Sequence, residues 1–414
     1  MAGGVAGSML VDGARRLVKG QRPSIGDLLL TPANAARIAG DLARMRGAAM
    51  KMGQLLSMDA GEMLPPELAR IMERLRADAD PMPPRQLQAV LNAQWGRGWE
   101  SRFAHFSPRP VAAASIGQVH RARTRDGRDL AIKVQYPGVR DSIDSDVDNL
   151  AGLLRLSRMV PDTLDVAPLL AEVKRQLRDE ADYEKEAGHL VRFGALLAGS
   201  PDFAVPAFHP DLSTPNMLAM AFVESEPLES LVDAPQSERD RVATLLIDLT
   251  LRELFEFGLM QTDPNFANYR YQPKSGRIVL LDFGATRALG THVAGTHRAV
   301  GRAGLTGDSA AIGRALLDAE LFGEDAPPAY RDAVLDMAML VTTAIDRDPL
   351  FDFGDPALTV ALRDRGMALA AERKLYHLPP VDTLFLQRKA AGMYLLAARL
   401  KARVPVRELL LRYL

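Results

Sequence analysis

Acidic and amide side chains between residues 263 and 282 have the types and the order that phosphoryl transfer needs. Asp263 is followed five positions later by Asn268, and a short apolar run then ends in Asp282-Phe283-Gly284. In such an arrangement one carboxylate orients the attacking hydroxyl or water, while the amide and the second carboxylate hold magnesium ions that neutralise the phosphates. Oxygen ligands of this kind suit Mg²⁺, which shares its remaining coordination with water and phosphate.

The Asp-Phe-Gly sequence is weak evidence by itself. A strand that leads into a turn often reads this way, with Gly284 supplying a positive φ angle, and for the isolated sequence that interpretation is the more frequent one. The Asp263 and Asn268 pair at the expected distance upstream makes the combination considerably more specific for a phosphate site.

A lysine upstream adds a second part. Lys133 lies in the apolar run 131–134, directly after the hairpin signal Asp126-Gly127. A lysine in a strand is more often a solvated edge residue, but one with apolar neighbours needs an anionic partner to offset its desolvation. Such a lysine can contact nucleotide phosphates. The candidate partner is Glu186 on the following helix, for which the alternative is an exposed helix carboxylate.

Small residues precede that hairpin where a nucleotide-binding loop would be rich in glycine. They are Ala112, Ala113, Ala114 and Ser115. Small side chains let the backbone approach phosphates, but alanine lacks the freedom of glycine at positive φ. The segment therefore departs from the loop of an ordinary protein kinase.

Together these motifs resemble the UbiB (AarF) family of atypical kinases. The chain has its alanine-rich loop, a Lys-x-Gly-Gln motif at 51–54 and a Glu-x-Asp motif at 180–182, and the match runs in order from about residue 40 to 290. The resemblance implies an α+β, protein-kinase-like bilobal fold. A small antiparallel-sheet N-lobe and a helical C-lobe would follow an N-terminal helical extension.

The resemblance also implies roles for individual residues. Lys133 would pair with Glu186, Asp263 would be the catalytic-loop aspartate, and Asn268 and Asp282 would bind Mg²⁺. The residues implied in binding the nucleotide, ATP or ADP, are Ala112, Ala113, Ala114, Ser115, Lys133, Glu180, Asp182 and Glu224, the last through backbone at the hinge.

Lys51 and Gln54 are further candidate catalytic residues, in an extension that would cover the site where a protein kinase accepts its peptide. Apolar residues of the helix expected at 41–58 form one stripe, and both side chains lie roughly opposite it. They could meet a polar cleft, although a solvated face is the more frequent explanation of this spacing. A second helix is expected at 67–77.

Two departures from the family pattern concern the catalytic loop and the hinge. Members commonly have His-Ala-Asp-Pro-His-Pro-Gly-Asn at the loop, whereas residues 261–268 here read Gln-Thr-Asp-Pro-Asn-Phe-Ala-Asn. Neither histidine is present, which argues against proton relay by histidine but leaves metal binding intact. Ser225 follows Glu224 where glycine is often found, so a stiffer hinge is expected.

Periodicity and turn signals give the expected order of elements and three domains. Strands are expected at 116–122, 130–135, 203–207, 217–223 and 278–281, one long helix from 165 to about 197, and mainly helices after Leu228. The domains are a helical extension at 1–100, an N-lobe at 101–224 and a helical C-lobe at 225–414. The basic amphipathic helix 385–402 could touch anionic lipid, but packing on the C-lobe is the more frequent role.

Composition narrows the class of protein. The 51 basic and 52 acidic side chains give a net charge of -1, which argues against a nucleic-acid partner. The absence of cysteine excludes disulfides and thiolate metal sites. Residues 1–5 lack the features of a signal peptide, and no apolar run approaches the roughly 20 residues that span a bilayer. We expect a cytoplasmic protein, and peripheral contact with the inner face of the membrane is left open as an alternative.

The leading hypothesis is an ATP-binding, Mg²⁺-dependent atypical kinase or ATPase that supports ubiquinone or other isoprenoid-lipid metabolism. Its implied partners are the nucleotide, an isoprenoid lipid and quinone-biosynthesis enzymes. The alternatives are a nucleotide-binding pseudokinase scaffold with negligible turnover and a small-molecule phosphotransferase of the aminoglycoside type. Neither a His-Glu-x-x-His zinc motif nor a Gly-x-Ser-x-Gly elbow occurs in the chain.

Overall fold

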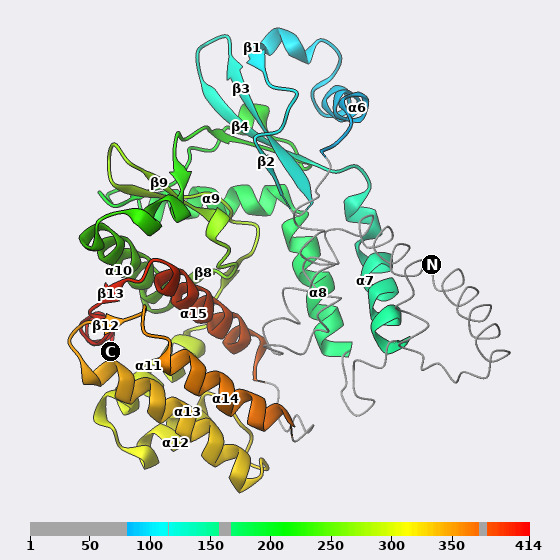
Figure 1. Cartoon of the computed structure of the whole chain (residues 1–414). Coiled ribbons are helices and arrows are strands. Elements are labelled where there is room, and N and C mark those ends of the chain that lie inside the picture. Colours follow the sequence, from blue (N-terminus) through cyan, green and yellow to red (C-terminus); the bar gives the residue numbers. More distant parts are fainter. Residues whose placement is uncertain (1–80, 115, 157–166, 372–378) are drawn as a thin grey trace, which may run out of the picture. The chain divides into compact units, whose positions relative to one another are not determined.

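A computed structural model describes residues 81–114, 116–156, 167–371 and 379–414 (Figure 1). Its contacts divide the chain into two units. The first, called the sheet unit, runs up to Ala187 and takes in Phe208–Phe222, and the second, the helical unit, holds Gly188–Ala207 and Val223–Leu414. The expectations for Lys51, Gln54, Ser115 and the helices of the extension lie outside the described residues. The predicted domain boundaries stay predictions.

An antiparallel five-stranded sheet forms the centre of the sheet unit. Its order is β1-β3-β4-β6, with β2 also paired to β3. The strands are β1 (Phe103–Phe106), β2 (Ala112–Ala113), β3 (Gly117–Thr124), β4 (Asp129–Gln135) and β6 (Met217–Ala221). The expected β3–β4 hairpin is confirmed, and Gly127 in its turn has a φ of 92°, which glycine adopts at little cost.

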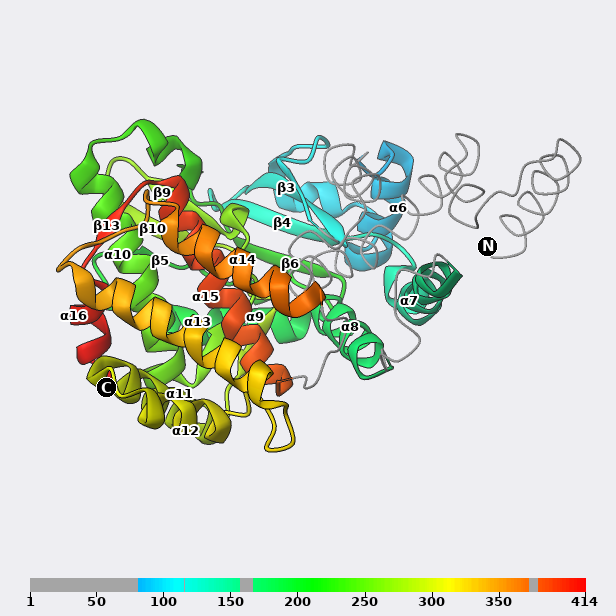
Figure 2. The same cartoon turned by 60° about the horizontal axis from the view of Figure 1, so that its bottom comes forward.

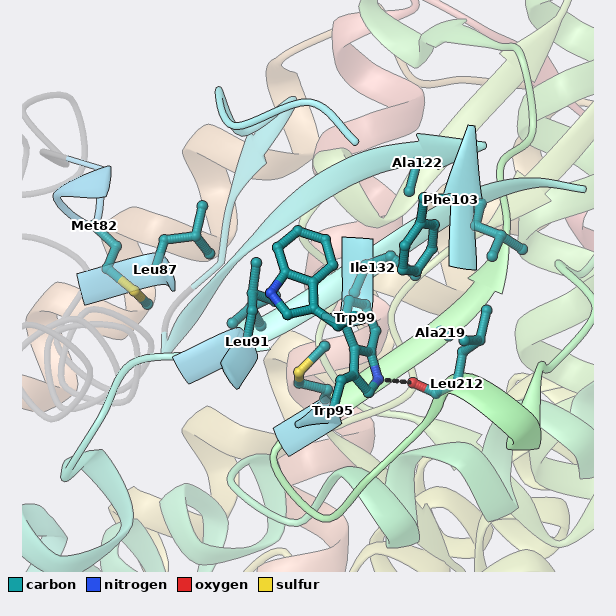
Figure 3. Close-up of a cluster of buried hydrophobic side chains, with 13 residues drawn as sticks. Met82, Leu87, Leu91, Trp95, Trp99, Phe103, Ala122, Ile132, Leu212 and Ala219 are labelled. Carbon is teal, nitrogen blue, oxygen red and sulfur yellow. Dashed lines mark hydrogen bonds between the residues drawn. The ribbon is translucent and has the colours of Figure 1, made fainter. Parts of the chain in front are cut away.

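An aromatic cluster packs against this sheet (Figure 3). In α6 (Pro84–Trp95), Leu87, Leu91 and Trp95 recur every four residues and are all buried. Trp99, in the 3₁₀ turn η1 (Trp99–Arg102), lies 5.7 Å from Trp95 between ring centroids. The indole of Trp95 also donates a hydrogen bond to the main-chain oxygen of Leu212 at 3.0 Å. Burial of these large side chains against the sheet gives the unit its core.

A neutral hydrogen-bond network crosses the same core. Nδ1 of the fully buried His120 lies 2.8 Å from the oxygen of Ser107, and its Nε2 lies 2.8 Å from Nε2 of Gln118. The oxygen of Gln118 accepts from the amide of Met82 at 2.7 Å. A proton on Nδ1 satisfies every partner, and burial lowers the pKa of His120, so the ring stays neutral.

The single helix expected at 165–197 is wrong, because the chain forms two helices there. These are α8 (Ala167–Glu180) and α9 (Tyr183–Leu196), which follow α7 (Val139–Leu156). The side chain of Asp182 accepts a hydrogen bond from the amide of Lys185 at 3.1 Å, which is the contact of a helix N-cap. Gln135 donates to the main-chain oxygen of Ala181 at 2.9 Å. Both contacts favour a break between the helices.

The described part of the helical unit carries three small sheets. Four strands pair in the order β5-β10-β9-β7: β5 (Phe203–Ala204), β7 (Glu226–Pro227), β9 (Tyr269–Gln272) and β10 (Arg277–Leu280). The second sheet pairs β8 (Leu259–Gln261) with β11 (Thr286–Ala288). The third pairs β12 (Phe351–Asp352) with β13 (Arg403–Val404). The expected strands near 203 and 278 are therefore confirmed, although β5 has two residues.

Helices make up most of this unit, and α13 runs alongside α14 (Figure 2). They are α10 (Gln236–Arg252), α11 (Thr291–Thr306), α12 (Ser309–Asp318), α13 (Pro328–Arg347), α14 (Ala357–Ala371), α15 (Val381–Arg399) and α16 (Val406–Leu411). Short 3₁₀ turns are η2 (Pro210–Leu212, in the sheet unit), η3 (Leu228–Asp233) and η5 (Phe266–Asn268), and η4 (Glu253–Phe257) is π-helical. No helix in the described ranges is long and apolar enough to cross a membrane.

Candidate functional site

The sheet unit brings Lys133 and Glu186 together. Strand β4 lies between β3 and β6, so Lys133 is not an edge residue. Its Nζ donates to the two carboxylate oxygens of Glu186 at 2.9 and 2.8 Å, and the side chains are 8% and 1% exposed. The predicted pairing is present. Burial excludes the alternatives of a solvated lysine and an exposed helix carboxylate.

Local sequence explains why helix α9 presents Glu186 to this strand. Asp182 caps the helix, so Glu186 falls in its first turn, where a carboxylate interacts favourably with the helix dipole. The ring of Tyr183 lies 5.1 Å from Nζ of Lys133. A methyl group added at Gly117 would overlap the oxygen of Val134 and the Tyr183 hydroxyl, so glycine permits this close approach.

The other predicted nucleotide-binding residues of the sheet unit have structural surroundings of several kinds. Ala112 and Ala113 are exposed in β2, and the amide of Ala114 donates to the oxygen of Gly117 at 2.8 Å. Glu180 is buried at the end of α8, and Asp182 caps α9 and lies 3.7 Å from Arg140. Their roles toward a nucleotide stay predictions.

Glu224 belongs to the helical unit and is exposed. Its main-chain oxygen accepts a hydrogen bond from Gln272 at 3.3 Å. Arg270 binds the next residue, Ser225, through both its hydroxyl, at 2.9 Å, and its carbonyl, at 2.5 Å. Side chains on β9 therefore hold this segment in place, and its predicted contact with the nucleotide base stays a prediction.

The β9–β10 hairpin brings the remaining predicted residues together. Its last pair is Tyr269 with Leu280, and beyond it the amide of Leu281 donates to the oxygen of Asn268 at 3.0 Å. Residues 261–268, here called the Asp263 loop, and residues 281–285, the Asp282 loop, thus meet at one end of the hairpin. Asn268 lies in the first of these adjoining loops and Asp282 in the second.

Hydrogen bonds order each loop internally. The amide nitrogen of the Asn268 side chain donates to the main-chain oxygen of Asp263 at 3.1 Å. Asp282 accepts from the main-chain amide of Gly284 at 2.9 Å, and Gly284 is not among the glycines with positive φ. The turn alternative therefore lacks the left-handed glycine on which it was based.

Phe283 anchors the Asp282 loop in the core of the helical unit. Its side chain is buried, and its ring centroid lies 5.0 Å from that of Phe193 on α9. The Nδ1 atom of His189, also on α9, lies 3.4 Å from the main-chain oxygen of Phe283. The residue between Asp282 and Gly284 thus fixes the loop through packing.

Arg388 is a site residue that sequence reasoning missed. Its Nη2 lies 2.9 Å from Oδ1 of Asp263, and the two side chains are 5% and 19% exposed. Helix α15 was expected to pack on the helical lobe, and it buries Phe385, Leu386, Met393 and Leu396. The alternative of a basic face toward lipid fails for Arg388 and Lys389, because both are buried. Arg388 and Lys389 follow Gln387 in an amphipathic helix, and that pattern gave no indication of their buried partners.

The side-chain oxygens in the two loops are suitable ligands for a Mg²⁺ ion that also binds phosphate. Asp282 offers a carboxylate, and Asn268 offers an amide whose nitrogen is turned toward Asp263. Mg²⁺ is usually bound by one or two protein oxygens, with water and substrate phosphates completing its octahedron. Hard oxygen ligands in adjoining loops satisfy that requirement.

Comparison with known proteins identifies related chains. Residues 74–315 match the model of the ABC1 atypical kinase-like domain. The mitochondrial atypical kinase COQ8B of Danio rerio is 37% identical over 415 residues, which cover 99% of this chain and 66% of that protein. COQ8B of Rattus norvegicus is 39% identical over 380 residues, 92% of this chain and 72% of that protein. The chain thus spans only part of the length of these relatives.

A solved structure has the same fold. It is a Mycobacterium tuberculosis protein in complex with erythromycin, with a TM-score of 0.63 and 25% identity, covering 91% of this chain and 94% of that one. With the family match, this likeness confirms the expected kinase-like α+β fold.

Proposed function

The chain belongs to the ABC1 (UbiB) family of atypical kinases, and from that premise we propose that it binds ATP with Mg²⁺ and catalyses phosphoryl transfer or hydrolysis. The observation that carries the proposal is the buried pair of Lys133 and Glu186. Burying a lysine is costly unless a carboxylate is held against it, and this carboxylate contacts the ammonium with both oxygens. An ammonium fixed in this way is suited to the α and β phosphates of a nucleotide.

The two loops of the helical unit would supply the remaining parts. Asn268 and Asp282 would hold Mg²⁺, which neutralises charge on the transferring phosphoryl group. Asp263 would orient the acceptor, hydroxyl or water. Because Arg388 holds the carboxylate of Asp263 in an ion pair at 2.9 Å, we assign this carboxylate to orientation of the acceptor. Phosphoryl transfer through a loose transition state needs mainly positioning and charge stabilisation.

The biological role that we propose is support of ubiquinone or other isoprenoid-lipid metabolism. Family membership and the similarity to COQ8B proteins support it, and membership disfavours a small-molecule phosphotransferase of the aminoglycoside type. Peripheral contact with a membrane and with quinone-biosynthesis enzymes belongs to the same proposal.

The test is release of phosphate from ATP by the full chain, with and without Mg²⁺, anionic liposomes and a phenol that mimics a quinone precursor. We expect release that needs Mg²⁺ and rises with liposomes and phenol. Asp282→Asn should abolish it, whereas the matched control Asp336→Asn, at an exposed position on α13, should not change it. Wild-type protein that neither releases phosphate nor binds nucleotide in a Mg²⁺-dependent manner would contradict the proposal.

A second candidate function is a nucleotide-binding scaffold with negligible turnover. The ion pair of Arg388 with Asp263 favours it, because the arginine offsets the charge of the carboxylate that would orient the acceptor. Nucleotide binding that requires Mg²⁺ but gives no phosphate release under any condition would select this candidate.

A further inference from the structure

A second buried ion pair lies beneath the Asp263 loop. Nζ of Lys389 on α15 is 3.0 Å from Oε2 of Glu253, and each side chain is 1% exposed. The same ammonium donates to the main-chain oxygen of Gln261 at 3.0 Å and to the hydroxyl of Tyr269 at 2.9 Å. A lysine ammonium has three N–H groups, and two of them are donated to these oxygens while the carboxylate of Glu253 provides the counter-charge.

The contacts continue from the ammonium to both loops. The hydroxyl of Tyr269 donates to the side-chain oxygen of Gln261 at 2.8 Å. The side-chain nitrogen of Gln261 in turn donates to the main-chain oxygen of Asp282. Gln261 begins the Asp263 loop and Tyr269 directly follows it, so one connected set of hydrogen bonds contacts both ends of that loop and the backbone of Asp282.

Burial and pairing together shift the pKa values of this set in the same direction, upward, and burial raises the pKa of the Glu253 carboxyl. Burial alone would lower the pKa of Lys389, but the Glu253 carboxylate and the Tyr269 hydroxyl raise it above its ordinary value. Hydrogen bonds in such an environment are strong and polarise one another, whereas an unpaired member would be costly. The set is therefore stable as a whole and sensitive to the loss of any one member.

An irregular turn of the backbone positions the carboxylate of Glu253. Glu253 begins the π-helical turn η4, which directly follows α10 and ends at Gly258 in the left-handed conformation. A π-helical turn is uncommon and occurs often at functional sites. Here the π-helical turn holds the Glu253 carboxylate in position for its ion pair with Lys389.

We propose that Glu253, Gln261, Tyr269 and Lys389 form a positioning cluster that holds the Asp263 loop and the Asp282 loop in one arrangement. Its consequence for catalysis depends on the proposed function, since the loops are those assigned to the acceptor and to Mg²⁺. The cluster itself is a property of the protein without nucleotide. None of its four residues is assigned a contact with substrate.

The test compares two hydroxyl deletions on the same strand. Tyr269→Phe removes the contacts with Gln261 and Lys389 but keeps the ion pair with Glu253 intact. The control Tyr271→Phe removes a hydroxyl that bonds Glu238 at 2.6 Å, two residues along β9. Both variants lose a partly or fully buried hydrogen bond, so a purely structural cost would affect them alike.

The first measurement is hydrogen exchange of the nucleotide-free full chain, followed by mass spectrometry of peptides covering 259–270 and 281–288. We expect Tyr269→Phe to speed exchange in both loops together, by about tenfold, as loss of about 1.4 kcal/mol of local stability would give. Tyr271→Phe should leave both loops unchanged. Equal exchange in the two variants, or acceleration in one loop alone, would overturn the cluster.

The second measurement is the affinity for ADP by calorimetry, with and without Mg²⁺. Tyr269→Phe should reduce the gain in affinity that Mg²⁺ gives by about tenfold, while Tyr271→Phe keeps it. Absence of any Mg²⁺-dependent gain in wild-type protein contradicts the proposed function. The exchange result decides the positioning cluster in either case.

Discussion

Two buried lysine–glutamate pairs, one in each unit, have the same chemistry and different surroundings. Lys133 with Glu186 in the sheet unit and Lys389 with Glu253 in the helical unit are each almost fully buried. Each ammonium also lies beside a tyrosine ring, at 5.1 Å for Tyr183 and 5.5 Å for Tyr269. Sequence motifs pointed to the first pair and gave no indication of the second.

The distribution of hydrogen bonds separates the two pairs. Lys133 donates to both oxygens of the Glu186 carboxylate, so this carboxylate holds the ammonium in a fixed position. Lys389 donates to a hydroxyl and to a main-chain oxygen and lies 3.0 Å from the carboxylate of Glu253, which suits an ammonium that fixes backbone. A buried ion pair is thus informative about function only when its other partners are known.

Removal of Lys389 should give the largest effect. Lys389→Met leaves Glu253 buried without its counter-charge, and breaking a buried pair in this way costs about 3–5 kcal/mol. Urea unfolding followed by circular dichroism measures the loss. The double variant Lys389→Met with Glu253→Leu should recover most of it, because an apolar pair needs no compensation. If the free energy of unfolding of Lys389→Met fell by less than about 1 kcal/mol, the structural role assigned to the pair of Lys389 and Glu253 would be contradicted.

The close contact of α15 with the Asp263 loop should give the next largest effect. In Gly392→Ala the added methyl group would overlap Pro264, and overpacking of this kind lowers the free energy of unfolding by about 1–3 kcal/mol. Gly313 on α12 has open space, so Gly313→Ala should instead stabilise the protein by about 0.5–1 kcal/mol. Thermal unfolding of both variants measures the two effects, and equal signs would contradict the inference that α15 presses on this loop.

Lys133→Met should weaken nucleotide binding by about tenfold, equivalent to about 1.4 kcal/mol, because its ammonium is proposed to contact the phosphates. The variant also leaves Glu186 buried without its counter-charge, so its free energy of unfolding should fall as that of Lys389→Met does. Calorimetric titration with ADP measures the change in variants whose circular dichroism is native. The control is Lys185→Met, which removes a half-exposed lysine paired with Asp179. Wild-type affinity in Lys133→Met would assign the first pair a purely structural role, like that of the second.

The smallest expected effect comes from the neutral network of the sheet unit. The pKa of His120 is lowered in the folded protein, so the unfolded chain takes up a proton first as the pH falls below 6.5. The free energy of unfolding should then decrease with falling pH, by at most about 1.4 kcal/mol per unit of pKa difference.

Urea unfolding at pH 7.5 and 5.5 should show this decrease, and His120→Gln should reduce it. The pKa of His297 in the helical unit is also lowered by burial, so part of the pH dependence should remain in the variant. An unchanged dependence in His120→Gln would show that the ring is not held neutral by its surroundings.

How much of the site could be predicted depended on where its determinants lie along the chain. The order of Lys133, Glu186, Asp263, Asn268 and Asp282 is written in local motifs, and the structure brings together the members within each unit. Arg388 and Lys389 act on residues 125 and 128 positions earlier, and helical periodicity carries no information about contacts over such distances.

The break between α8 and α9 was missed for a related reason. In the sequence, Asp182 fits a continuous helical pattern. In the structure its side chain accepts a hydrogen bond from the amide of Lys185 and caps α9, and the side chain of Gln135 donates to the main-chain oxygen of Ala181. A local cap and one long-range contact together therefore overrode the propensity for a continuous helix. The predictions for Lys51, Gln54 and Ser115 lie outside the described residues and stay predictions.

The aromatic cluster of the sheet unit makes the chain an internally labelled protein. Its two tryptophans, Trp95 and Trp99, are both in that cluster, so tryptophan fluorescence, excited selectively, reports on the sheet unit. Far-ultraviolet dichroism is dominated by the helical unit, which holds most of the described helices. Comparing the two signals in one denaturation experiment would show, without any added dye, whether the units unfold as one cooperative body or in sequence.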